Sequence, residues 1–271
     1  MLTRVLSGVV MVALVILILC YSPLWTFNVF IAVCAFIGHN EYQCMVNPSR
    51  SFVARSTLGA CATGLALSPL WPSAITVQSV FGLMFIAISL AHLRKPEPIQ
   101  NSIHRVSIDL LGIVYLGFTL PALIQLRNLH PEGWGWVFFA ILVTAGGDTG
   151  GYFAGRAFGK RKLAPILSPK KTIEGYIGGL ILGTAGAFFA RAIFTSCTDL
   201  SILDCIFIGL AGVTVGVWGD LFESMIKRAT KVKDSGTLIP GHGGILDRVD
   251  ALLFVSPVIL FYLQTIKPLF V

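Results

Sequence analysis

Charged residues are scarce in this chain. Only 12% of its 271 residues are Asp, Glu, Lys or Arg, about half the ~25% of an ordinary soluble domain. Hydrophobic residues make up 55%, and the mean hydropathy is +0.81. A soluble fold of this length could not hide so much apolar surface. The low charge therefore excludes an ordinary soluble enzyme and a disordered chain, and it predicts a protein with several membrane spans.

The sequence also has no CxxC pair, no long-period repeat and no polar linker. Most of its six cysteines lie in apolar runs, where single buried thiols are expected, so a disulfide-stapled secreted module is excluded. We expect one integral membrane domain over residues 1–271. Residues 1–140 would be mainly scaffold, and residues 141–271 would carry the active site.

Nine apolar runs predict about nine transmembrane helices in one all-α bundle. The runs cover residues 5–21, 24–37, 56–70, 74–91, 106–126, 134–154, 173–190, 202–222 and 251–266. Pro121 predicts a kink in the fifth run, because proline removes a backbone donor and crowds the preceding turn.

The basic residues are distributed unevenly over the loops that join these runs. Seventeen of the twenty would lie on one side of the membrane, and only Arg127, Arg191 and Lys267 on the other. This asymmetry predicts a cytoplasmic N-terminus, in a membrane of the bacterial inner type. The long polar loops at about 155–172 and 223–250 then face the cytoplasm. We read the net charge of +7 as a record of topology and of an anionic partner at the membrane, not of nucleic acid.

Two series of glycines repeat every four residues, namely Gly147, Gly151, Gly155 and Gly159, and then Gly175, Gly179 and Gly183. This spacing puts small residues on one helix face, which favours close helix packing. Bare backbone could instead line a cavity or approach a phosphate, and both interpretations stay open.

Polar residues beside these glycines are the first candidates for a site. Asp148 lies within an apolar span, where a carboxylate is costly unless it is paired or functional; a salt bridge to Arg156 is the structural alternative. Further on, Pro169 and Thr172 are typical of a helix start. Two lysines at a helix N-terminus form an anion site, because free N–H groups and the helix dipole add to the ammonium charges. Lys170 and Lys171 are therefore candidate phosphate ligands.

The densest group of polar residues lies between residues 220 and 250. If this segment is helical at its start, one polar face carries Asp220, Glu223, Ser224, Lys227 and Arg228. Asp247 and Asp250 are three residues apart, just before the last span. Two helix ends would then present carboxylates to a common cleft.

The chemistry of this group suits phosphate transfer. Hard carboxylate oxygens suit Mg²⁺, and lysine and arginine suit phosphate oxygens. The turn Gly241-His242-Gly243-Gly244 could offer successive N–H groups to an anion. Metal, cations and in-line geometry are the requirements of phosphoryl or nucleotidyl transfer. The structural alternative is a solvated, salt-bridged loop.

The segment from Ser224 to Asp250 resembles the signature of the phosphatidate cytidylyltransferases, or CDP-diacylglycerol synthases. The matching positions are Ser224, Lys227, Arg228, Lys233, Asp234, Gly236, Pro240, His242, Gly243, Gly244, Asp247, Arg248 and Asp250. An upstream segment is also similar to the family, through Asp148-Thr149-Gly150, Gly155-Arg156, Phe158-Gly159-Lys160, Ser168-Pro169-Lys170-Lys171-Thr172 and Glu174-Gly175. Gly151 and Ile173 depart from the pattern. The resemblance covers about the second half of the chain.

The resemblance implies that CTP and phosphatidic acid react to give CDP-diacylglycerol and pyrophosphate, in phospholipid biosynthesis, with Mg²⁺ and a second cation such as K⁺ as a further candidate. It implies a metal held by Asp220 and Asp247, with Asp250 as an additional or alternative ligand. The predicted catalytic residues are Asp220, Asp247, Lys227 and Arg248. The predicted substrate-binding residues are Asp148, Lys170, Lys171, Thr172, Glu174, Ser224, Arg228, Lys233, His242, Gly243 and Gly244.

Two other functions remain as alternatives. A CTP-dependent membrane lipid kinase, acting on a polyprenol or phytol, would add one phosphoryl group instead of CMP. A transporter for a phosphorylated solute would bind anions without turnover, and it would be supported by inverted repeats, which the sequence lacks. Assembly as a homodimer is also left open.

Overall fold

The structure is a computed structural model that describes residues 2–94, 98–129 and 132–267. Its helices in these ranges are α1 (Leu2–Ile16), α2 (Leu24–Val46), α3 (Phe52–Ala66), α4 (Val77–Leu93), α5 (Ser102–Gly117), α6 (Pro121–Asn128), α7 (Trp134–Phe158), α8 (Ile173–Ile193), α9 (Ile202–Ala229) and α10 (Leu246–Phe261). Each predicted apolar run falls on one or two of these helices. The predicted helical architecture is therefore confirmed.

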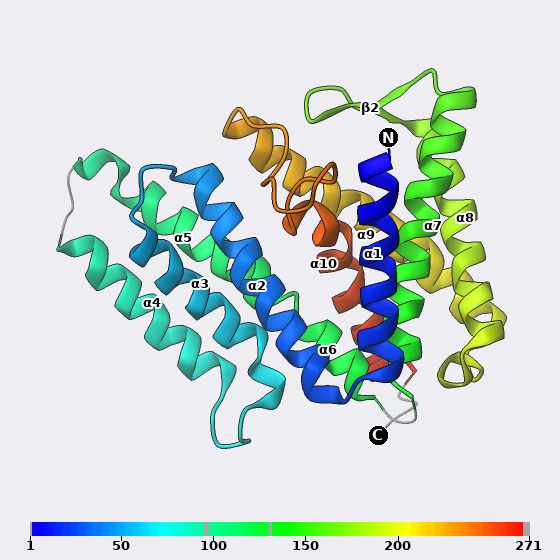
Figure 1. Cartoon of the computed structure of the whole chain (residues 1–271), viewed down its shortest axis with the longest axis horizontal. Helices are drawn as coiled ribbons and strands as arrows, with labels where there is room; N and C mark the ends of the chain where they lie inside the picture. Colours follow the sequence, from blue (N-terminus) through cyan, green and yellow to red (C-terminus); the bar gives the residue numbers. More distant parts are fainter. Residues whose placement is uncertain (1, 95–97, 130–131, 268–271) are drawn as a thin grey trace.

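The helices form two groups joined through α10 (Figure 1). Helices α2 to α5 pack together on one side, and α7, α8 and α9 pack together on the other. Helix α10 contacts α9, α7, α6 and α2, and α1 crosses in front of it in this view. Large side chains such as Trp136, Phe139, Leu116 and Ile124 are fully buried in the main core. Helix α10, together with α6, which contacts both α2 and α7, thus brings the two halves of the chain together.

Six helical stretches in the described ranges are long and apolar enough to cross a membrane. They are Leu24–Val46, Ile99–Asn128, Trp134–Phe158, Ile173–Ile193, Ile202–Ala229 and Leu246–Ile266. Val5–Tyr21 and Val77–Leu93 are shorter apolar helices. The chain is accordingly an integral membrane protein, whereas nine crossings and a cytoplasmic N-terminus stay predictions.

The fifth predicted run is divided at Pro121. Helix α5 ends at Gly117, and α6 begins with Pro121 in its first turn. Proline has no N–H to continue the helix before it, but its fixed φ suits the first position of the next one. The predicted interruption at Pro121 is confirmed as a short turn between the two helices, and the N–H groups of Phe118 and Leu120 still donate back to Val114 and Leu116 across it.

Two helices extend beyond their apolar runs and carry polar residues with them. Helix α9 continues to Ala229, so that Lys227 lies in its last turns. Helix α10 begins at Leu246, so that Asp247 and Asp250 lie in its first turns. Cations near a helix C-terminus and carboxylates near an N-terminus both interact favourably with the helix dipole. The prediction that two helix ends carry these groups is confirmed.

One addition to the helical fold is a short antiparallel hairpin between α7 and α8. Strand β1 (Lys162–Ala164) pairs with β2 (Ser168–Thr172), and β2 leads directly into α8. The hairpin projects beyond the ends of α7 and α8 (Figure 1). It gives the predicted polar loop at 155–172 a fixed shape, with Lys170 and Lys171 on β2.

The repeated glycines lie where α7 packs against α8. A Cβ at Gly150 would be 2.3 Å from the carbonyl oxygen of Gly178, and a Cβ at Gly183 would be 2.8 Å from that of Val143. Likewise a Cβ at Gly179 would be 2.8 Å from the oxygen of Gly147. Such distances leave no room for any larger residue. The helix-packing interpretation of the glycine series is supported, because the two backbones approach closely along their length.

We expect Gly150→Ala to lower the free energy of unfolding by about 1–3 kcal/mol, because its Cβ would overlap the backbone of α8. Gly82→Ala on α4 is the matched control, since its Cβ would have no neighbour within 4 Å. Thermal unfolding of the two purified variants in the same detergent measures the difference. Equal stability of the two would contradict a close α7–α8 contact.

Candidate active site

The polar face of α9 forms one wall of the candidate site. Asp220, Glu223, Ser224 and Lys227 all lie on this helix, at the predicted helical spacing. The hydroxyl of Ser224 donates to Asp220 Oδ1 over 3.3 Å. The interpretation of this stretch as one polar helix face is confirmed.

Lys227 joins α9 to α10 through two carboxylates. Its ammonium donates to Glu223 one turn earlier and, over 2.7 Å, to Asp247 Oδ1. The three side chains are almost fully buried, with 10% of Lys227 and 7% of Asp247 exposed. A buried ammonium is tolerated only when carboxylates and hydrogen bonds replace its water. The predicted contact of Lys227 with a triphosphate stays a prediction, because both ion pairs engage its ammonium in this structure.

Asp247 is the most heavily bonded carboxylate of the site. Its Oδ2 accepts hydrogen bonds from the N–H and the hydroxyl of Ser235, each over 2.8 Å, and from the N–H of Gly244 over 2.9 Å. With Lys227 on Oδ1, both oxygens are engaged. The turn before α10 is therefore folded around this side chain.

Gly243 of this turn is required by the same carboxylate. Gly243 has a φ of +85°, and a Cβ there would be 2.5 Å from Asp247 Oδ2. A left-handed φ and such a close approach together require glycine. The predicted substrate contact of Gly244 stays a prediction, and in this structure its N–H donates to Asp247.

A second polar cluster joins the hairpin to α9 and α10. Lys171 Nζ lies 2.7 Å from Asp220 Oδ2. Asp148 on α7 interacts electrostatically with Asp220, Lys171 and Arg248. Asp250 interacts in the same way with Asp220 and Asp148. Residues from both polar loops and from three helices thus meet at one end of the bundle.

Two residues predicted as substrate ligands are used by the protein's own backbone. Thr172 is the N-cap of α8, and its hydroxyl accepts the N–H of Gly175 over 3.1 Å. Glu174 accepts the N–H groups of Lys160 and Arg161 over 3.0 and 3.2 Å. Thr172 was correctly placed at a helix start, and the predicted substrate contacts of both residues stay predictions.

The remaining basic residues differ in how accessible they are. Arg228 donates to the backbone oxygens of Leu167 and Val232, and so supports the tip of the hairpin. Lys170, Lys233 and Arg248 are exposed. A phosphate could reach these three without breaking an ion pair. Arg228 is exposed as well, but its guanidinium is engaged by two backbone oxygens.

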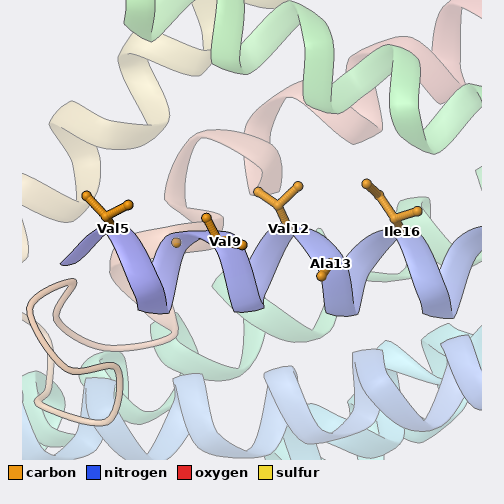
Figure 2. A pocket seen from close by; sticks show the side chains of 6 residues that line it. Val5, Val9, Val12, Ala13 and Ile16 are labelled. Atoms are coloured by element: carbon orange, nitrogen blue, oxygen red, sulfur yellow. The ribbon is translucent and has the colours of Figure 1, made fainter. Parts of the chain in front are cut away.

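His242 contacts the first helix. Its Nδ1 lies 2.8 Å from the hydroxyl oxygen of Ser7. The Ser7 hydroxyl donates to the carbonyl oxygen of Pro240 over 3.0 Å. A groove runs along α1 (Figure 2), lined by Val5, Gly8, Val9, Val12, Ala13 and Ile16. Its lining is entirely apolar, so it suits hydrocarbon and not the reacting groups.

The carboxylates suit Mg²⁺ in their chemistry. Asp220 and Asp250 are neighbours with hard oxygen donors and no soft ligand. In the described part of the chain, however, no three His, Cys, Asp or Glu side chains are arranged to hold a metal. Asp247 would have to release Ser235 or Lys227 before it could coordinate one. Asp220 is engaged in the same way by Lys171 and Ser224. The donor chemistry thus fits Mg²⁺ at all three carboxylates, and Asp220 and Asp247 would each exchange a protein partner for the metal.

Three residues of this region were not among the predicted site residues. Glu223 had a detectable signal, since it lies four residues before Lys227 on the same helix face. Ser235 stands inside the signature, at a position the pattern leaves free. Glu41, on α2, accepts hydrogen bonds from the first residues of α10. Nothing in its local sequence connects it with residues two hundred positions later.

Replacing Lys227 by methionine leaves Glu223 and Asp247 buried without their cation. We expect Lys227→Met to lower the free energy of unfolding by about 3–5 kcal/mol. The exposed Lys233→Met is the control and should change it by less than about 0.5 kcal/mol. Thermal unfolding in detergent compares the two, and similar values would mean that the Lys227 ion pairs contribute little.

Comparison with known proteins agrees with the motifs. The family model described as the cytidylyltransferase family matches residues 2–266. A protein of Bacillus subtilis named phosphatidate cytidylyltransferase is 43% identical over 155 residues, which is 56% of each chain. Proteins of the same name from Staphylococcus saprophyticus and Staphylococcus aureus are 38% and 36% identical, over 70% of each chain.

The match to the B. subtilis protein thus spans about half of its length, whereas the family model spans nearly the whole of this chain. The resemblance found from the signature residues is confirmed, and it extends to the N-terminal half. The chain belongs to the cytidylyltransferase family.

Proposed function

We propose that this protein transfers CMP from CTP to phosphatidate and releases CDP-diacylglycerol and pyrophosphate, as a step of phospholipid biosynthesis. The observation that carries the proposal is the ion pair between Lys171 and Asp220. It joins the two separate motif segments into one cluster of cations and carboxylates at the end of membrane-spanning helices. The names of the relatives support the same activity.

The lipid substrate can supply its own nucleophile. The second pKa of a phosphate monoester is ~6, so the headgroup is largely a dianion at neutral pH. Its oxygen attacks the α-phosphorus of CTP, the bond to the β-phosphate breaks, and pyrophosphate leaves. The protein therefore needs no general base, but it has to bring two anions together. Lys170, Lys233 and Arg248 are exposed and would bind their phosphate oxygens.

The carboxylates of the site would bind a metal cation, whereas the basic side chains would bind phosphate. Asp220 and Asp250 would hold Mg²⁺, which when bound neutralises charge on the phosphates and on the leaving group. Lys171 is paired with Asp220 in this structure, so its ammonium is positioned beside the same oxygens. A monovalent cation such as K⁺ remains a further part of the proposal. The acyl chains would stay among the spans, while the headgroup meets the nucleotide at the membrane surface.

The proposed orientation places the site on the cytoplasmic side of a bacterial inner membrane. The support is the excess of lysine and arginine in the loops on that side of the predicted topology. CTP is a water-soluble polyanion that does not cross a bilayer unaided, so the site has to open to the compartment that contains it.

The assay that tests the function combines purified protein, CTP, phosphatidate and Mg²⁺ in mixed micelles. We expect release of pyrophosphate together with a lipid product whose mass exceeds that of phosphatidate by the mass of CMP less one water molecule. A lipid that gained labelled γ-phosphate would instead identify a lipid kinase. Binding of either substrate without any product would contradict both enzymes.

We expect chelation with EDTA to abolish turnover and added Mg²⁺ to restore it. Asp220→Asn should raise the Mg²⁺ concentration for half-maximal velocity at least about tenfold, because a carboxamide is a weaker ligand. Asp204→Asn is the matched control on the same helix, at its other end, where Asp204 pairs with Lys267 and Tyr262. Steady-state velocities over a Mg²⁺ series measure the shift, and equal shifts in both variants would remove Asp220 from the metal site.

A further inference from the structure

Glu41 connects the N-terminal half of the chain to the candidate site. It is a buried residue near the end of α2, with 9% of its surface exposed. Its Oε1 accepts the N–H of Ile245 over 3.0 Å, and its Oε2 accepts the N–H of Leu246 over 2.9 Å. Each carboxylate oxygen therefore faces one backbone donor at the start of α10.

These bonds replace a cap that α10 does not have. The residue at its N-cap position is Ile245, whose side chain has no atom that could accept a hydrogen bond. The first N–H groups of a helix need acceptors, and a negative charge beside them is favoured by the helix dipole. Glu41 supplies both from a different helix. The start of α10 is consequently fixed relative to α2.

Glu41 is coupled to Asp247 through Ser235. The Ser235 hydroxyl lies 2.8 Å from Asp247 Oδ2 and 3.3 Å from Glu41 Oε2. It has one proton, so it can donate to only one of the two carboxylates at a time. Glu41 and Asp247 therefore share a donor, and a shift of one carboxylate alters the hydrogen bonding of the other.

Two glycines of the signature make room for Glu41. A Cβ at Gly244 would be 2.4 Å from Glu41 Oε2 and 2.3 Å from the Ser235 hydroxyl. A Cβ at Gly236 would be 2.8 Å from Glu41 Oε1, and its three nearest atoms would all belong to Glu41. Small residues at both positions are thus explained by the approach of a side chain from α2.

We infer that Glu41 is a positioning residue for the site. It holds the first turn of α10, and through it the carboxylate of Asp247, in register with Lys227 on α9. The inference rests on the proposed function, because the site it positions is the one assigned to CMP transfer. Glu41 itself touches no proposed substrate group.

The kinetic test uses Glu41→Gln in the full-length protein. Whichever way the amide is turned, its NH₂ group faces a backbone N–H of Ile245 or Leu246, so one hydrogen bond is replaced by a repulsive contact. We expect kcat per folded enzyme to fall at least about tenfold, with KM for CTP changed by less than about threefold, because small displacements of reacting groups cost rate. A merely structural role would lower the yield of folded protein and leave kcat of the folded fraction unchanged, and that result would overturn the inference.

A double variant tests whether the effect passes through Glu41. Gly236→Ala should lower kcat in the wild-type background, because its Cβ displaces the Glu41 carboxylate. In the Glu41→Gln background it should add less than about a twofold loss, since the contact is already disturbed. If the loss of kcat in the double variant equals the product of the losses in the two single variants, the two effects are independent and the inference is overturned. If Glu41→Gln does not fold, Glu41→Asp takes its place, and failure of both to fold would assign Glu41 to folding alone.

Hydrogen exchange of the Ile245 and Leu246 amides gives a readout that needs no turnover. We expect the protection of one of them, the amide that faces the Gln NH₂ group, to be lost in Glu41→Gln and the protection of both to be kept in Asp109→Asn. Asp109 is a buried carboxylate of α5 that pairs with Arg50 and lies 3.3 Å from His92 Nε2, so it controls for the loss of a buried charge. A wild-type protein that forms no product would refute the proposed function, while unchanged protection in Glu41→Gln would refute the capping by Glu41.

Discussion

The arrangement of the site depends on one buried ammonium group. Without Lys227, the negative charges of Glu223 and Asp247 would be buried close together without a cation. Without either carboxylate, the buried ammonium of Lys227 would lose one of its two ion pairs. The three groups therefore restrict sliding of α9 and α10 along each other. Asp247 then fixes the turn before α10, since three donors of that turn are bonded to its Oδ2. A long polar loop next to a membrane would otherwise have many conformations.

Close packing of α7 and α8 completes the same end of the bundle. Their glycines bring the two backbones into contact, and α8 begins directly after the hairpin strand that carries Lys171. The position of Lys171 beside Asp220 on α9 thus depends on two helices whose backbones approach closely at their glycines. Rigid elements place charged groups more accurately than loops do, which is what a reaction between two anions requires.

Much of this could be predicted from the sequence, because the relevant patterns are local. Apolar runs locate the helices, the spacing of Asp220 and Lys227 indicates one helix face, and Pro121 marks a break. The partners of Thr172 and Glu174 could not be predicted, since a residue that caps its own backbone and one that binds a ligand have the same sequence. Glu41 could not be found for a different reason. Its partners are backbone N–H groups of α10, which every residue has and no motif records.

The bond between Glu41 and Leu246 joins residues separated by 205 positions in the chain. At a translation rate of ~5–20 residues per second, roughly 10–40 s pass between the synthesis of one partner and that of the other. During this interval the earlier helices have been synthesised but α10 has not. The Glu41 carboxylate then has no helix N-terminus to bind, and only water can solvate it. The end of α2 therefore has to stay at the aqueous border of the membrane until the last helix arrives, and a chain that stops before residue 246 lacks that helix and has no assembled site.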